Sequence, residues 1–165
     1  MEKIIITGGA GFIGSAIYEK LRENEYDVFV VDDLSFGKRE NINISDSHFF
    51  QVDILEKESI VKIFNQIQPD WILHLAAIHF IPYCNSNPFS SSKINILGTL
   101  NIIDACESLS TDAKLLFAST AAVYSDYDYA INENNSINPQ DIYGLSKIIG
   151  EKLCKKYFAI TNRAT

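Results

Sequence analysis

The apolar and polar positions along the chain alternate between short β-branched runs and longer stretches with helical spacing. This alternation is typical of βαβ units, in which helices cover a parallel sheet. The run from Val28 to Val31 is apolar throughout, as in a strand that is covered on both faces. The predicted strands are Lys3–Thr7, Val28–Val31, His48–Val52, Trp71–Leu75 and Ala113–Ala118. The pattern therefore predicts an α/β fold with a doubly wound parallel sheet.

The helical spacing of apolar residues predicts four helices that separate or follow these strands. They run from Ile13 to Leu21, from Ile60 to Ile67, from Asn87 to Ser108 and from Ile142 to Tyr157. Pro69 ends the second helix, and Asn87-Pro88 supplies the N-cap and first turn of the third. The polar stretch from Ser125 to Asp141 is too long for a simple connection, which indicates a loop that forms part of a site. We expect a single domain.

The 165 residues are 47% hydrophobic and 21% charged, as in an ordinary globular domain with one core. A formal net charge of -7, with no basic run to offset it, would repel a polyphosphate backbone, so nucleic acid is not an expected partner. The chain shows neither a signal peptide nor roughly 18 consecutive uncharged apolar residues, so we expect a cytoplasmic protein without a membrane segment. Cys84, Cys106 and Cys154 lack metal-ligand spacing, which predicts buried thiols and no metal site.

A glycine-rich turn follows the first predicted strand. Gly8, Gly11 and Gly14 satisfy a G-x-x-G-x-x-G spacing, and Gly9 with the last two satisfies G-x-G-x-x-G. Glycine lets the chain turn tightly, lets backbone N–H groups approach a pyrophosphate, and lets the next helix lie close to the sheet. The spacing alone also fits a purely structural turn. Its position between a strand and a helix favours a dinucleotide site in a Rossmann-like sheet.

An acidic residue, Asp32, ends the second predicted strand, about 20 positions after the glycines as the dinucleotide pattern requires. Its carboxylate can accept hydrogen bonds from both adenosine ribose hydroxyls and would repel the additional phosphate of NADP. We therefore expect NAD as the cofactor. Lys38 and Arg39 lie near enough along the chain to moderate this preference. The alternative is that Asp32 and Asp33 only terminate a strand.

Tyr143 and Lys147 lie four residues apart, so a helix places both side chains on one face. A free tyrosine has a pKa of about 10, and a neighbouring cation lowers the pKa of a phenol. We expect Tyr143 to accept a proton from a substrate hydroxyl as a hydride leaves the carbon, with Lys147 beside the nicotinamide ribose. Such a pair is also frequent by chance. Leu145, Ile149 and Leu153 would supply the packing face of this helix.

Two hydroxyl residues, Ser119 and Thr120, follow the fifth predicted strand. Ligands of open parallel sheets bind at the carboxyl edge, where these hydroxyls emerge. A hydroxyl at this edge could hydrogen-bond a substrate oxygen and pass its proton towards Tyr143, or it could simply cap the strand. The proximity of this edge to the glycine turn favours the functional interpretation.

Taken together and in this order, the motifs resemble the extended short-chain dehydrogenase/reductase family. Within it they most resemble the NAD-dependent sugar-nucleotide epimerases, such as UDP-glucose 4-epimerases, and the dehydratases, and the resemblance covers nearly the whole chain. The segments that carry it are Thr7 to Gly14, Asp32, Asp53-Ile54, His74-Leu75-Ala76-Ala77, Ser119-Thr120 and Tyr143 to Lys147. The combination is specific, whereas no single motif would be.

The resemblance implies a nucleotide-sugar substrate, NAD as cofactor and three catalytic residues: Thr120, Tyr143 and Lys147. Asn95 matches the asparagine that supports the active site in this family. The resemblance also implies a homodimer, paired through the helices that carry Asn95 and Tyr143. The residues implied to bind the cofactor are Gly8, Gly11, Phe12 and Ile13 at the pyrophosphate, Asp32 at the adenosine ribose, Asp53 and Ile54 at the adenine, and Leu75, Ala76, Ala77, Asn95, Tyr143 and Lys147 along the remaining length.

The chain departs from the family pattern at three places. Ser125 replaces the glycine that usually follows Val-Tyr, and His79 stands where UDP-glucose 4-epimerases have a lysine. Residues 158–165 stand where a sixth strand should begin. We therefore expect residues 1–165 to form the NAD-binding domain with the catalytic residues, truncated near that strand, with the C-terminal substrate domain absent.

The catalytic residues leave more than one reaction open. An epimerase would return the hydride to the other face of the sugar carbon, whereas a dehydratase would place a carboxylate beside Thr120. Ala121 and Ala122 supply none, which favours an epimerase. The alternatives are a reductase, and a dinucleotide-binding module that turns over little substrate because the substrate domain is missing.

Overall fold

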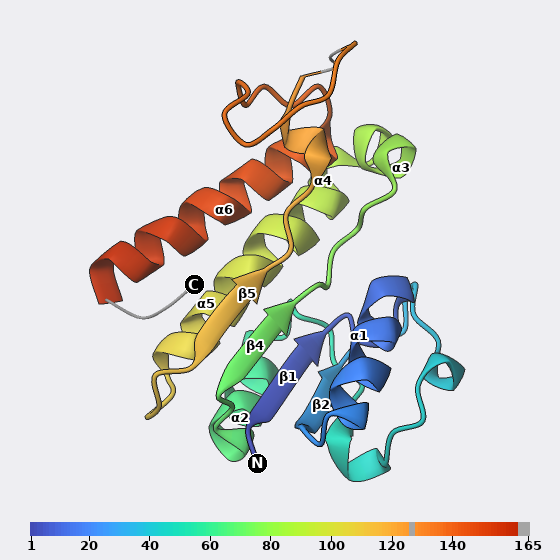
Figure 1. Ribbon diagram of the computed structural model, residues 1–165, viewed down its shortest axis with the longest axis vertical. Helices are drawn as coiled ribbons and strands as arrows, with labels where there is room; N and C mark the ends of the chain where they lie inside the picture. The colour runs from blue at the N-terminus through green and yellow to red at the C-terminus, as the bar shows by residue number, and fades with distance from the viewer. Residues whose placement is uncertain (126–127, 162–165) are drawn as a thin grey trace.

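A five-stranded parallel sheet forms the centre of the computed structural model, which describes residues 1–125 and 128–161 (Figure 1). The strand order is β3-β2-β1-β4-β5, and every neighbouring pair is parallel. The strands are β1 (Lys3–Thr7), β2 (Asp27–Val31), β3 (Phe49–Phe50), β4 (Trp71–His74) and β5 (Lys114–Phe117). The predicted fold class is confirmed. The strand order reverses beside β1, so the carboxyl ends of β1 and β4 flank the crevice in which such sheets bind ligands.

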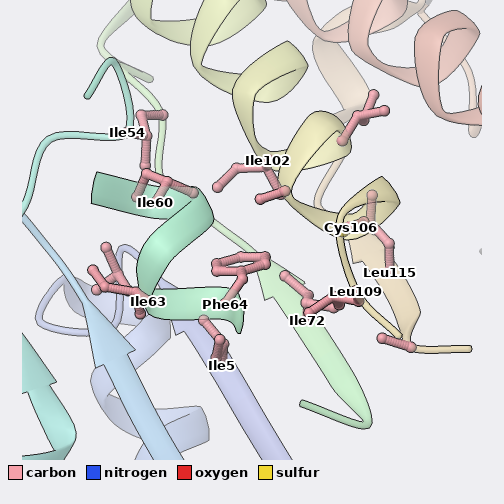
Figure 2. Packing of buried hydrophobic residues seen from close by; sticks show 14 of the residues in the cluster. Ile5, Ile54, Ile60, Ile63, Phe64, Ile72, Ile102, Cys106, Leu109 and Leu115 are labelled. Carbon is pink, nitrogen blue, oxygen red and sulfur yellow. The ribbon is translucent and has the colours of Figure 1, made fainter. Parts of the chain in front are cut away.

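Helices pack against both faces of the sheet. Tyr18 of α1 shares one core with Ile4, while α2, α5 and α6 contribute to the opposite core, which contains Ile5. Figure 2 shows Phe64 of α2 close to Ile5 and Ile72 in this second core. Successive strand residues point to opposite faces, so the apolar run of β1 serves both cores. The helices are α1 (Phe12–Glu23), α2 (Lys57–Ile67), α3 (Ile81–Ser86), α4 (Pro88–Ser92), α5 (Thr99–Glu107) and α6 (Ile142–Thr161).

The third strand is shorter than predicted. Only Phe49–Phe50 pair with β2, because the preceding residues, Asp46–His48, form a 3₁₀ turn. The His48 ring stacks on Phe29 at a centroid distance of 4.4 Å, and its Nε2 lies 3.0 Å from Asp27 Oδ1. These side-chain contacts attach the turn to β2 without extending the strand.

The long helix predicted from Asn87 to Ser108 is interrupted. α4 continues into a π segment, Lys93–Gly98, in which one residue more is accommodated per turn, and then into α5. Gly98 at the end of this π segment faces Ile54, where an added Cβ would lie 2.4 Å from the Ile54 Cδ1 atom. The short helix α3, which precedes α4, is not predicted by the apolar spacing.

The last helix differs from the prediction in length and in orientation. α6 continues to Thr161, so residues 158–161 are helical where a sixth strand was expected, and residues 162–165 lie outside the described part. Its buried face carries Lys147, Gly150 and Cys154, whereas Leu145 is 46% exposed. The predicted packing face is therefore wrong at Leu145, whereas Leu153 packs against the core as predicted. A Cβ on Gly150 would lie 2.3 Å from the Phe117 ring, so the glycine brings this face close to β5.

The cysteines and the apolar character of the helices can be compared with the sequence-based expectations. Cys84, Cys106 and Cys154 are all buried thiols, as predicted. Among the helices of the described residues, none combines the length and the apolar character needed to cross a bilayer.

Candidate functional site

A cleft of about 430 Å³ opens at the carboxyl ends of β1, β2 and β4. All the residues predicted to bind the dinucleotide line this cleft except Asn95, whereas Thr120 is the one predicted catalytic residue outside its lining. The predicted residues that line it are Gly8, Gly11, Phe12, Ile13, Asp32, Asp53, Ile54, Leu75, Ala76, Ala77, Tyr143 and Lys147. A more open hollow of about 570 Å³ lies along the outer edge of β5, between Trp71 and Phe158, and contains none of the predicted residues.

The glycine turn brings backbone atoms together at the floor of the cleft. Gly8 has a φ of +73°, and a Cβ there would lie 2.8 Å from the backbone nitrogen of Ala76. A Cβ on Gly14 would lie 2.2 Å from the carbonyl oxygen of Gly8. α1 starts after Gly11, and among the described side chains none caps its first turn, which also lacks an acidic residue. The N–H groups of this turn can therefore bind an anion such as a pyrophosphate.

Asp32 links the glycine turn to the end of β2. Its Oδ2 accepts a hydrogen bond from the Ala10 N–H at 3.0 Å, and its Oδ1 accepts one from the Leu34 N–H at 2.9 Å. Burial raises the pKa of this carboxyl group, and the two backbone hydrogen bonds act in the opposite direction. Each carboxylate oxygen has a second acceptor site, so Asp32 can still receive hydrogen bonds from ribose hydroxyls.

Arg39 does not point to the adenosine end of the cleft. Its guanidinium donates to the carbonyl oxygens of Ile42 and Ile44, lies 3.2 Å from the Asp46 carboxylate, and stacks on the Phe49 ring at 4.6 Å. Two of its guanidinium nitrogens are thus engaged away from the cleft, whose lining does not include Arg39, and the expectation that Arg39 moderates the cofactor preference stays a prediction. Lys38, which is exposed, remains the nearby cation.

The π segment and α5 lie behind the wall of the cleft and hydrogen-bond to its backbone. Asn95 Oδ1 accepts from the Ile78 N–H at 2.8 Å, and Asn95 Nδ2 donates to the Ile78 carbonyl at 2.9 Å and to Ser146 Oγ at 3.0 Å. Asn101 Nδ2 donates to the Ile54 carbonyl at 2.9 Å. Asn95 is 3% exposed, so its amide supports the cleft wall and the α6 helix from within the core.

Tyr143 and Lys147 reach the cleft from α6. Lys147 Nζ donates to the Ala118 carbonyl at 2.8 Å and lies 4.8 Å from the centre of the Phe117 ring. Burial lowers the pKa of Lys147 to about 8. Burial raises the pKa of Tyr143, and the side chain of Thr120 opposes that shift. The predicted lowering of the tyrosine pKa is thus wrong, because desolvation outweighs the hydrogen bond with Thr120.

The two hydroxyls after β5 have separate partners. Ser119 lines the cleft, and its hydroxyl donates to the Glu151 carboxylate on α6. Thr120 Oγ1 accepts from the Ala122 N–H at 3.2 Å and thereby caps a 3₁₀ turn, Ala121–Val123. The capping bond uses Thr120 Oγ1 as an acceptor, so its proton is free to interact with the Tyr143 phenol.

The loop from Ser125 to Asp141 leads into α6 and is attached to the backbone near the start of that helix. Tyr124 and Ile137 form an antiparallel bridge, and the Asp141 carboxylate accepts from the Gly144 N–H at 2.7 Å. A Cβ on Gly144 would lie 2.2 Å from the Ala122 carbonyl. These contacts fix the backbone on both sides of Tyr143. Residues 126 and 127 of this loop lie outside the described residues.

Sequence reasoning did not assign a binding function to several residues of the cleft. They include Ser35, Phe36, Ile78 and Ile94. Phe36 is 67% exposed. Its position four residues after Asp32, in the loop that leaves the carboxyl end of β2, is a signal that could have identified it, because ligands of open parallel sheets bind at that edge. Ile78 and Ile94 have no such signal, since they resemble ordinary core residues.

A sequence model of the NAD dependent epimerase/dehydratase family matches residues 4–163. A protein of Methanocaldococcus jannaschii, provisionally named as a UDP-glucose 4-epimerase, is 42% identical over 156 residues, which are 93% of this chain and 50% of that protein. dTDP-glucose 4,6-dehydratase 1 of Escherichia coli is 36% identical over 148 residues, which are 81% of this chain and 41% of the enzyme. The chain thus spans about half the length of the curated relatives it matches.

The fold has close counterparts among solved structures. The UDP-glucose 4-epimerase of Thermus thermophilus, solved as a complex with NAD, superposes with a TM-score of 0.89 at 32% sequence identity. The superposition covers 98% of this chain and 52% of the epimerase chain.

Proposed function

The chain belongs to the NAD dependent epimerase/dehydratase family, and we propose that it is the NAD-binding and catalytic domain of a sugar-nucleotide epimerase. One observation carries this proposal: a single cleft runs from the Asp32 carboxylate to Tyr143 and Lys147. A cleft with a ribose-binding acid at one end and an acid–base pair at the other suits a dinucleotide whose reactive ring must lie beside the chemistry.

The residues of the cleft fit NAD. In the proposal, the first turn of α1 binds the pyrophosphate, Asp32 binds the adenosine ribose, and Asp53 with Ile54 borders the adenine. Leu75, Ala76 and Ala77 line the middle, and Lys147 holds the nicotinamide ribose. The close approach of Gly8 to the Ala76 backbone supports this assignment, because a side chain at Gly8 would close the cleft floor. When bound, NAD accepts a hydride from a sugar carbon and returns it to the other face.

Tyr143 would move the proton in this reaction. Its phenolate oxygen accepts the proton of the sugar hydroxyl as the hydride leaves the same carbon, so the sugar is oxidised to a ketone. Tyr143 then returns the proton as the ketone is reduced. Thr120 interacts with the Tyr143 phenol and can hydrogen-bond the same oxygen of the substrate. Lys147, 5.9 Å from the centre of the tyrosine ring, supplies the positive charge that favours the phenolate.

A nucleotide sugar is the proposed substrate, in keeping with the names of both curated relatives. A dehydratase is the second candidate, because one of these relatives is a dehydratase. Ala121 and Ala122, which follow Thr120, offer no carboxylate for elimination of water and favour epimerisation. The cytoplasmic location expected from the sequence stays a prediction.

We also propose a homodimer that pairs the helices carrying Asn95 and Tyr143. Leu97 and Leu100 on the first of these helices are 44% and 39% exposed, and Leu145 on the second is 46% exposed. Apolar side chains on two neighbouring helices form a surface that a second copy can cover.

Calorimetry with NAD and NADP tests the cofactor assignment. We expect the chain to bind NAD more tightly than NADP, because Asp32 would repel a 2′-phosphate. Tighter binding of NADP, or no binding of either, would contradict the assignment. A coupled assay on nucleotide sugars then tests the reaction: an epimerase interconverts the two sugars without net formation of NADH, whereas accumulating NADH would indicate a simple dehydrogenase.

A further inference from the structure

The His74 side chain lies behind the wall of the cleft and takes no part in the proposed proton transfer. It is 1% exposed at the end of β4. Its Nδ1 is 2.7 Å from Thr7 Oγ1 on β1, and its Nε2 is 3.0 Å from Thr99 Oγ1 on α5. The ring therefore bridges the strand that leads into the glycine turn and the helix behind the cleft.

The protons of this bridge can be assigned from its partners. Thr99 Oγ1 donates its only proton to the Asn95 carbonyl at 2.7 Å, so it can only accept from His74. His74 Nε2 consequently carries a proton. A neutral imidazole carries one proton, so Nδ1 accepts, and Thr7 Oγ1 donates to it. Thr7 Oγ1 then accepts from the Ala76 N–H at 3.4 Å. Every donor in this series of hydrogen bonds thus has an acceptor.

A charged ring does not fit this arrangement. A proton on Nδ1 would face Thr7 Oγ1 and displace the proton that this hydroxyl donates. His74 is fully buried, and the Lys147 cation acts on it; both effects lower its pKa, to about 3. The Phe117 ring, 5.8 Å away, offers no charge to compensate. The neutral form of the His74 ring is therefore the one that this environment stabilises.

The bridge connects to both sides of the cleft. At one end, Thr7 holds the Ala76 N–H of the cleft wall, beside the close approach of Gly8. At the other end, the Asn95 amide binds Ile78 and Ser146, and Ser146 Oγ donates to the Tyr143 carbonyl at 2.7 Å. A continuous series of buried and partly buried hydrogen bonds thus joins the strand before the glycine turn, the cleft wall and the start of α6.

We propose that His74 is a positioning residue: as a neutral ring protonated on Nε2, it fixes the spacing between Thr7 and Thr99 and thereby the cleft wall against which the dinucleotide lies. The ligand in this statement rests on the proposed function. The proton arrangement of the ring does not, because it is a property of the protein alone.

Nuclear magnetic resonance of the ¹⁵N-labelled chain tests the proton arrangement without any ligand. Long-range ¹H–¹⁵N correlations distinguish a protonated from an unprotonated ring nitrogen, and the variants His48→Gln and His79→Gln identify the signals of the other two histidines. We expect His74 to show a protonated Nε2 and an unprotonated Nδ1 at every pH between 5 and 8. A proton on Nδ1, or a ring that becomes charged in this range, would overturn the proposal.

The variants Thr99→Val and Thr99→Ser test whether the bridge positions the cleft. Valine keeps the shape but removes the acceptor of the Nε2 proton, so we expect loss of the single tautomer and NAD binding weakened by about tenfold, the size of effect that follows loss of one buried hydrogen bond. Serine retains the hydroxyl and should restore both properties. Thr7→Val should likewise weaken binding, and the double variant should lose less than the product of the two factors, because both changes break one series of bonds.

A merely structural residue would behave differently. If Thr99→Val lowers the unfolding midpoint but leaves the NAD dissociation constant and the His74 tautomer unchanged, the positioning proposal is wrong. If the unmodified chain fails to bind NAD while His74 shows the expected tautomer, the proposed cofactor is wrong and the proton arrangement stands.

Discussion

The ammonium group of Lys147 lies in a nearly dry environment, with 3% of the residue exposed and the Phe117 ring on one side. Burial lowers its pKa from 10.5 to about 8, so the folded chain disfavours the charged form. The sign follows from linkage: the unfolded chain binds this proton more tightly, so the cost to stability is fully present below pH 8 and disappears as the pH rises from 8 to 10.5. The buried Lys147 ammonium thus lowers the stability of the folded chain, a cost that is more frequent at functional sites than elsewhere.

We predict that Lys147→Met stabilises the ligand-free chain at pH 7 by about 2 kcal/mol, because methionine removes the buried charge and keeps most of the apolar stem. Urea unfolding at pH 7 and at pH 9.5 measures the effect, which should be smaller at the higher pH. The exposed Lys156 on the same helix supplies a matched control, Lys156→Met, for which we expect little change. A destabilised Lys147→Met variant at pH 7 would contradict this reading of the site.

The sequence predicts the position of some residues in the cleft, but it does not predict the contacts and pKa values of others. The glycine turn and Asp32 were predictable because their pattern depends on local spacing, and the structure places Gly8, Gly11, Gly14 and Asp32 around one cleft. The engagement of Arg39 and the raised pKa of Tyr143 were not, because both depend on groups that only folding brings near. His74 is 67 residues from Thr7 in the chain, so its bridge leaves no pattern in the sequence.

At the level of single elements, α6 depends on a close contact with β5. Gly150 permits that contact, since a Cβ there would lie 2.3 Å from the Phe117 ring. Lys147 and Gly150 lie on the same buried face, one turn apart, so a displacement of α6 at Gly150 would also move the Lys147 ammonium.

We predict that Gly150→Ala destabilises the chain by about 2 kcal/mol, because overpacking outweighs the higher helix propensity of alanine. NAD binding should weaken in the same variant. Thermal unfolding and calorimetry provide the two measurements. Ile160→Ala, at a position that is 72% exposed near the end of α6, controls for effects of substitution in this helix. A more stable Gly150→Ala chain would show that the helix propensity of alanine dominates and that the contact between Gly150 and the Phe117 ring is looser than described.

Elements with a strong apolar period were predictable in type, and their boundaries moved by a few residues. The pattern missed α3 because its six residues are too few to show a period, although Pro82 at its first turn is a helix-start signal. The π segment escaped prediction because one additional residue in a turn leaves the local apolar spacing almost unchanged. The strand predicted at His48–Val52 is only two residues long because a 3₁₀ turn occupies Asp46–His48, and an apolar pattern does not reveal such a turn.

At the level of the whole molecule, the exposed leucines on the Asn95 and Tyr143 helices should determine the oligomeric state. We predict that light scattering gives the mass of a dimer for the unmodified chain and of a monomer for a Leu100→Glu/Leu145→Glu variant, because two charges per copy would then be buried at the interface. Ile160→Glu places the same charge on an exposed apolar residue elsewhere and should leave the dimer intact. An unmodified chain that is monomeric would remove the proposed interface.

The π segment between α4 and α5 sets the rotational phase between the two ends of the cleft. Asn95 inside it faces Ile78 and the α6 helix. Gly98, the last residue of the segment, and Asn101 beyond it face Ile54, and Thr99 hydrogen-bonds His74. Removing one residue would restore a regular α-helix but turn one half by about 100° relative to the other. Only one group of contacts could then persist. A helix with better local geometry would thus separate the Ile54 end of the cleft from the Tyr143 end, so the positions of both ends relative to each other depend on this irregular turn.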